Sequence, residues 1–84
     1  MCRNITALRG LEPPATDEEI YAAALQFVRK VAGLTTITAA TRGPVDQAVA
    51  SIAHATTRLL QALPDRRVPP QTEPPLRRIA AREA

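Results

Sequence analysis

The stretch TDEEIYAAALQFVRKVAG, residues 16–33, carries the start and stop signals of one complete α-helix. Thr16 suits the N-cap position, and Glu19 three residues later completes a capping box. Acidic residues in the first turn and basic residues in the last turn both complement the helix dipole. Gly33 suits the left-handed position that commonly follows a helix. These signals predict a helix over residues 16–33.

The apolar face of this helix is wider than one neighbouring helix covers. At 100° per residue from Ile20, its apolar side chains fall within about 140° of arc, and Tyr21 and Leu25 widen the surface to about 200°. The others are Ala23, Ala24, Phe27, Val28 and Val31. Three candidates could cover this surface. The first is the N-terminal segment, in which Ile5, Leu8 and Leu11 recur at every third position. The others are a second copy, which would make a four-helix bundle, and a different protein.

A second helix is predicted over residues 44–63. Pro44 suits the first helical position, because the first amides of a helix are unpaired in any case. A clean apolar stripe of about 100° of arc then runs to the last residue, and the next proline stops the helix. Residues 34–42 between the two helices are rich in β-branched side chains and predict a loop. Alternatively, the second helix starts near Thr38 and kinks at Gly43-Pro44.

From residue 64 onward the chain becomes rich in proline and arginine, and it holds five of the eight prolines there. Such a segment cannot bury enough apolar surface to offset its ordering entropy, so residues 64–84 are predicted to be an extended or disordered tail. Leu76, Ile79 and Ala80 nevertheless have the spacing of one helical face, so a short helix could form there on docking.

The predicted fold class is therefore all-α, with one small domain over residues 1–63. Its centre is an antiparallel hairpin of two helices, about 16–33 and 44–63. The short N-terminal segment packs on this hairpin, and the proline-rich C-terminal tail is mobile.

Composition limits the function classes. The 84 residues permit one small domain, and no apolar run approaches the roughly 18 residues of a membrane span, so no membrane partner is expected. A net charge of +3 permits a polyanionic partner without requiring one. A single cysteine, with no secretory pattern at the start of the chain, favours a reducing cytoplasm.

Three segments of the chain resemble a bacterial family that is classed only as a domain of unknown function, number 2277 in that series. These segments are Met1-Cys2-Arg3-Asn4-Ile5, then Glu12-Pro13-Pro14-Ala15-Thr16 with Glu18-Glu19-Ile20, then Ala22-Ala23-Ala24-Leu25-Gln26-Phe27-Val28-Arg29-Lys30-Val31 before Gly33. The resemblance covers residue 1 to about 63. It implies a cytosolic, all-helical bacterial protein with no established activity, and it supplies no catalytic residues.

Cys2 is the residue that most suggests chemistry. Removal of Met1 would place its thiol beside an α-amine, the combination used by enzymes with an N-terminal nucleophile, and a redox role is a further possibility. Two helices offer little concave surface for a substrate, so thiol chemistry is the third hypothesis. His54 and this cysteine fall far short of a zinc signature, and no catalytic, metal or cofactor residues are predicted.

The second hypothesis is an accessory binder of nucleic acid. Four arginines of the tail could contact phosphates: Arg66, Arg67, Arg77 and Arg78. No aromatic side chains are interleaved with them to stack on bases, which makes this hypothesis weaker than the first.

The leading hypothesis is a non-catalytic module for protein interaction or assembly. Its partner would be a second copy or a larger protein, which would cover the surplus apolar surface of the helices. The predicted anchors of this contact are Tyr21, Leu25, Phe27, Leu59 and Leu63.

Overall fold

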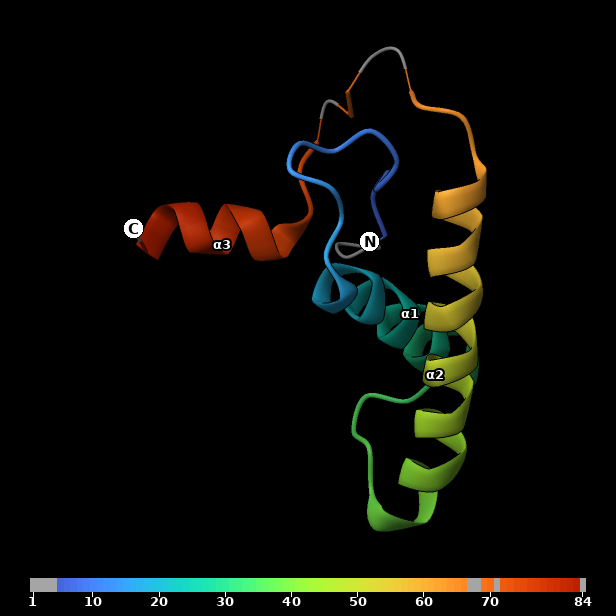
Figure 1. Ribbon diagram of the computed structural model, residues 1–84. Coiled ribbons are helices and arrows are strands. Elements are labelled where there is room, and N and C mark those ends of the chain that lie inside the picture. The colour runs from blue at the N-terminus through green and yellow to red at the C-terminus, as the bar shows by residue number, and fades with distance from the viewer. Residues whose placement is uncertain (1–4, 67–68, 71, 84) are drawn as a thin grey trace.

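The computed structural model describes residues 5–66, 69–70 and 72–83, and the described residues are all-helical, without a strand. Helix α1 spans Asp17–Ala32, α2 spans Ala39–Ala62 and α3 spans Pro75–Glu83. Helices α1 and α2 pack against each other, while α3 extends to one side of them (Figure 1). The all-α class is thus confirmed.

Helix α1 begins and ends where the sequence signals place it. Thr16 Oγ1 accepts a hydrogen bond from the Glu19 amide at 3.1 Å, and the Glu19 carboxylate accepts one from the Thr16 amide at 2.8 Å. At the other end Gly33 adopts a left-handed φ of 69°, and the Leu34 amide donates back to the Arg29 carbonyl. Both ends are therefore closed by local hydrogen bonds, which is why the boundaries of α1 were predictable.

Helix α2 begins at Ala39, so the prediction of a start at Pro44 is wrong and the alternative start near Thr38 is confirmed. Thr38 is the N-cap in an extended conformation, and its amide donates to Thr41 Oγ1 at 2.9 Å. Pro44 lies inside the helix, where it lacks the amide that would bond to the fourth preceding carbonyl. A start at Pro44 would make Gly43 the N-cap, and no side chain is available there to close the helix end as Thr41 does for Thr38.

The core consists of two adjoining apolar clusters. The first joins α1 to α2 through Val49, which is fully buried, together with Ala24, Val28 and Val45. The second joins the N-terminal segment to α1 through Leu8, Leu11 and Ile20, with Leu60 of α2 packed against them. Ala53 touches both clusters.

The N-terminal segment is therefore the cover that the structure places on α1 and the end of α2, since Leu8 and Leu11 are buried. Ile5 was expected in the same role, but its side chain is 44% exposed. The segment thus covers the part of α1 around Ile20 and leaves other apolar surface open.

The end of the chain differs from the expected extended tail. Residues 75–83 form α3, with Pro75 at the first helical position, where its missing amide costs nothing. Pro74 is buried and its carbonyl accepts the amides of Arg77 and Arg78. The spacing of Leu76, Ile79 and Ala80 indicates a short helix at this place, and the structure has one. Its attachment is a polar contact with α1, described below, which composition does not reveal.

Val49→Ala tests the first cluster. Removing two buried methyl groups should lower the free energy of unfolding by about 1–3 kcal/mol, since both transfer energy and packing are lost. Val31→Ala is the matched control, because the same change at a side chain that is 71% exposed should alter it by less than about 0.5 kcal/mol. Urea unfolding followed by circular dichroism measures both; equal effects would contradict the core assignment.

Candidate interaction site

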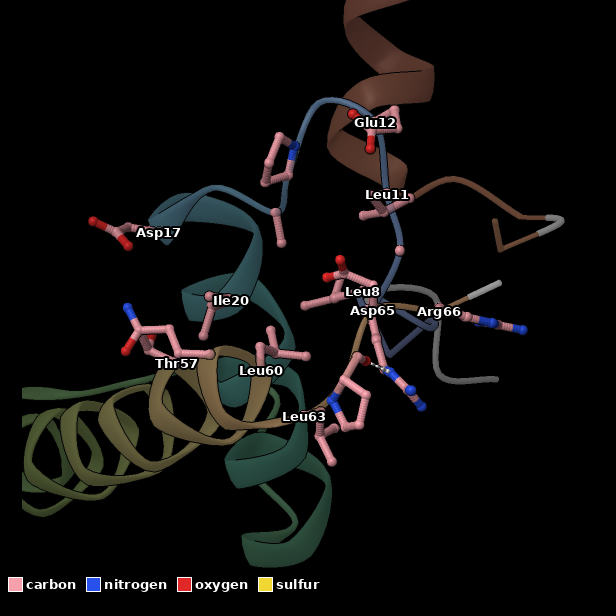
Figure 2. A pocket seen from close by; sticks show the side chains of 16 residues that line it. Leu8, Leu11, Glu12, Asp17, Ile20, Thr57, Leu60, Leu63, Asp65 and Arg66 are labelled. Atoms are coloured by element: carbon pink, nitrogen blue, oxygen red, sulfur yellow. Dashed lines mark hydrogen bonds between the residues drawn. The ribbon is translucent and has the colours of Figure 1, made fainter. Parts of the chain in front are cut away.

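Two depressions lie where α1, α2 and the N-terminal segment meet. The first is a cavity of about 620 Å³ between the N-terminal segment, the start of α1 and the end of α2 (Figure 2). Its apolar side chains Leu8, Ile20 and Leu60 lie close together, and Asp17 and Arg66 point away from them (Figure 2). The charged groups around this cavity therefore do not converge on one point.

The rim of the cavity is held by a contact between distant segments. Arg9 Nε donates to the Pro64 carbonyl at 2.9 Å, which ties the N-terminal segment to the end of α2. Gly10 has a φ of 89°, and a Cβ built there would lie 2.9 Å from Arg66 Cβ. Only glycine fits this position, because it combines a left-handed backbone with a close approach to another side chain.

The second depression is an apolar groove of about 300 Å³ between α1, α2 and the N-terminal segment. Ala23 and Phe27 line it from α1, Ile52 and Leu60 line it from α2, and Ile5 lines it from the N-terminal segment. The remaining lining residues are Thr6, Leu8, Ala24 and Thr56. The Thr56 hydroxyl donates to the Ile52 carbonyl at 2.7 Å, so it is already used inside α2. We call this depression the apolar groove.

The apolar groove is incompletely covered. Phe27 is 48% exposed, and Ile5 stands across from α1 with nearly half of its surface exposed. Phenylalanine and isoleucine are usually far more buried than this in a folded domain. The groove is therefore the place where the apolar surplus of α1 remains open.

The five predicted anchors do not form a single surface. Phe27 lines the apolar groove, and Leu63 lines the cavity. Leu25 is half-buried and packs against the first core cluster, so it belongs largely to the fold. Tyr21 and Leu59 are exposed and line neither depression. Sequence reasoning did not single out Ile5, Ile52 and Leu60 as groove residues, although the last two follow the helical period of the α2 stripe.

Arg77 has a structural partner. Its Nε lies 2.6 Å from Glu19 Oε2, and its Nη2 donates to Glu19 Oε1 at 3.1 Å. The same Nη2 donates to the carbonyls of Pro13 and Pro14 at 2.6 and 3.1 Å. One guanidinium thus joins α3, the start of α1 and the segment before it. We call this set of contacts the Arg77 clamp.

The Arg77 clamp also changes the acidity of Glu19. The hydrogen bonds from Arg77 hold the pKa of the Glu19 carboxyl below its ordinary value of 4.5, and the Thr16 amide and the positive charge of Arg77 act in the same direction. Burial of Glu19, which is 4% exposed, opposes this shift but is the smaller effect. The pKa of Arg77 is raised by the same contact.

The other predicted nucleic-acid contacts are not gathered with Arg77. Arg66 is exposed at the cavity rim, and Arg78 is exposed on α3. Arg67 and the predicted thiol Cys2 lie outside the described residues.

The whole chain, residues 1–84, matches the profile of a family described as an uncharacterized conserved protein, DUF2277. The chain belongs to this family. The match extends past residue 63, where the resemblance seen in the sequence ended, so the residues of α3 lie inside the matched region. No curated protein and no solved structure matches the chain.

The described part of this DUF2277 chain has neither a candidate metal-binding cluster nor a candidate membrane-spanning helix. Within residues 5–66, 69–70 and 72–83, no three His, Cys, Asp or Glu side chains are grouped so that they could hold a metal ion. In the same part of the chain, each helix is too short or too polar to cross a bilayer.

Glu19→Gln tests the Arg77 clamp. Glutamine keeps the acceptor of the capping box but loses the charge, so the free energy of unfolding at pH 7 should fall by about 1–3 kcal/mol. Because folding lowers the pKa of Glu19, this contribution is complete above pH 4.5 and is lost as the pH falls below it. Urea unfolding at pH 7 and pH 3 should therefore show a difference between wild type and variant that shrinks at pH 3.

Glu18→Gln is the control for this experiment, because Glu18 is an exposed acid in the same helical turn. It should change the free energy of unfolding by no more than about 0.5 kcal/mol at pH 7. A Glu19→Gln effect that is equally large at both pH values would show that the charge of Glu19 is not what stabilises the fold.

Proposed function

We propose that this protein is a non-catalytic interaction module that binds an apolar segment of a polypeptide in the apolar groove. The observation that carries the proposal is the position of Phe27, half exposed along a groove whose other walls are Ile52, Leu60 and Ile5. In this proposal α1 and α2 are the two arms of the predicted antiparallel hairpin, and the module acts in the cytoplasm.

Two large apolar side chains of the groove, Phe27 and Ile5, are incompletely buried. Full burial of a phenylalanine or isoleucine side chain contributes about 1.5–3 kcal/mol. Phe27 and Ile5 are each close to half exposed, so a bound apolar segment would gain about 1 kcal/mol from each of them. A domain of this size has a small core, so surface of this kind is better explained by a partner than by stability.

The shape of the groove favours a helix as the bound segment. It runs between side chains of two helices, and an amphipathic helix fills such a groove with apolar residues at spacings of three or four. The charged groups near the cavity do not enter the groove, so the contact would be apolar at its centre and polar at its edge.

The nucleic-acid hypothesis is weaker in comparison. Arg77, one of its four arginines, is engaged with Glu19 and with the carbonyls of two prolines. A phosphate would have to compete with those contacts, which leaves the hypothesis with Arg78 on α3 and the consecutive residues Arg66 and Arg67.

A photo-reactive side chain at position 27 tests the proposal. We expect p-benzoylphenylalanine in place of Phe27 to cross-link to a polypeptide when full-length protein in living cells is irradiated, because the groove holds the partner against that ring. Mass spectrometry of the cross-linked species identifies the peptide.

The control places the same reactive residue at His54, which is exposed on α2 and does not line the groove. Cross-linking there should be much weaker. Equal yields at both positions, or none at position 27, would contradict a binding role for the groove.

A further inference from the structure

We infer that the apolar groove binds helix α3 of a second copy of this chain, so that two copies exchange their α3 helices. The inference rests on the proposed function and names its partner. It follows from two apolar surfaces of one chain, both uncovered, that have matching chemistry.

Helix α3 has an exposed apolar face. Leu76 and Ile79 stand three positions apart on one face and are 39% and 44% exposed. Arg77 and Arg78 lie on the opposite face of the same helix. An exposed helix with apolar residues at this spacing and charges opposite them has the pattern of a segment that lies in an apolar groove.

The Arg77 clamp keeps α3 out of the apolar groove of its own chain. Arg77 lies next to Leu76 and is fixed to Glu19 at the start of α1. Phe27 lies eight positions further along α1, about 12 Å along the helix axis. From its attachment, α3 extends away from α1 and α2 (Figure 1). Its apolar face is thus presented outward while the Arg77 clamp is closed.

A second copy satisfies both surfaces at once. Each copy has one groove and one outward α3, so a two-fold pair makes the same contact twice. Neither copy needs to open its Arg77 clamp, because α3 is already outside its own core. The resulting contact is apolar, with Leu76 and Ile79 against Phe27 and Ile5.

The charge of the chain sets the salt dependence of this pairing. Each copy has a formal net charge of +3, so two copies repel each other weakly at low ionic strength. Added salt screens that repulsion, and the dimer should hold or strengthen between about 50 and 500 mM salt, roughly a third to three times physiological ionic strength. Binding to phosphates would respond in the opposite direction.

Sedimentation velocity of the purified full-length chain is the test. The wild type should be a dimer at about 100 µM, whereas Phe27→Asp and the double variant Leu76→Asp with Ile79→Asp should each weaken dimerisation at least about tenfold. Arg78→Gln, on the polar face of α3, should leave it unchanged. Circular dichroism checks that each variant keeps its helices.

A mixture of the two weakened variants separates loss of contact from loss of folding. Phe27→Asp retains an intact α3, and the Leu76 and Ile79 variant retains an intact groove. Mixing them should restore a heterodimer, because one of the two contacts is then complete. Misfolded variants would not rescue each other.

Three results would overturn the inference: a monomeric wild type at about 100 µM, a dimer that persists in Phe27→Asp, or a mixture that stays monomeric. The proposed function is judged separately by the cross-links at position 27. Cross-links to a different protein with a monomeric wild type would retain the groove as a binding site and remove α3 as its occupant. Absence of any cross-link there, with a monomeric chain, would remove both.

Discussion

The breadth of the apolar face of α1 is the constraint on which the rest of the structure depends. One helix covers only part of that face, and α2 covers the part around Ala24 and Val28 with Val45 and Val49. The N-terminal segment covers the next part, around Ile20. The cavity and the groove follow from this division, because each is lined by both covers as well as by α1.

The start of α1 holds two sets of polar contacts that share one side chain. Glu19 accepts from the Thr16 amide in the capping box and also receives Arg77 from a helix 58 positions away in the sequence. A side chain that is 4% exposed can remain charged there because both contacts stabilise the ionised form. Helix α3 is therefore attached to α1 by an ion pair, whereas α2 is attached to α1 by apolar packing.

The parts of the fold that were predictable from sequence are those fixed by neighbours along the chain. The ends of α1 followed from Thr16, Glu19 and Gly33, whose roles are completed within one helical turn. The start of α2 was placed five residues late, because threonines favour a loop by propensity and the bond between Thr38 and Thr41 gives no periodic signal. The helical periodicity placed Phe27 on the apolar face of α1. It did not show which part of that face would remain exposed in the folded chain.

Contacts between segments far apart in the sequence have no local signal that would predict them. Arg77 looked like one of four similar tail arginines, and nothing local distinguishes it from Arg78. Its role depends on the position of Glu19 and of two proline carbonyls, which only the folded chain brings together. The same holds for the close approach of Gly10 to Arg66.

The double use of Glu19 has a consequence for how the molecule opens locally. If α3 detaches, a buried carboxylate loses its cation, and the first turn of α1 must fray to hydrate it. Fraying of that turn in turn displaces the Glu19 carboxylate to which Arg77 is hydrogen-bonded. Hence the two segments form one cooperative unit, and their backbone amides would exchange with deuterium together, ahead of the amides around Val49.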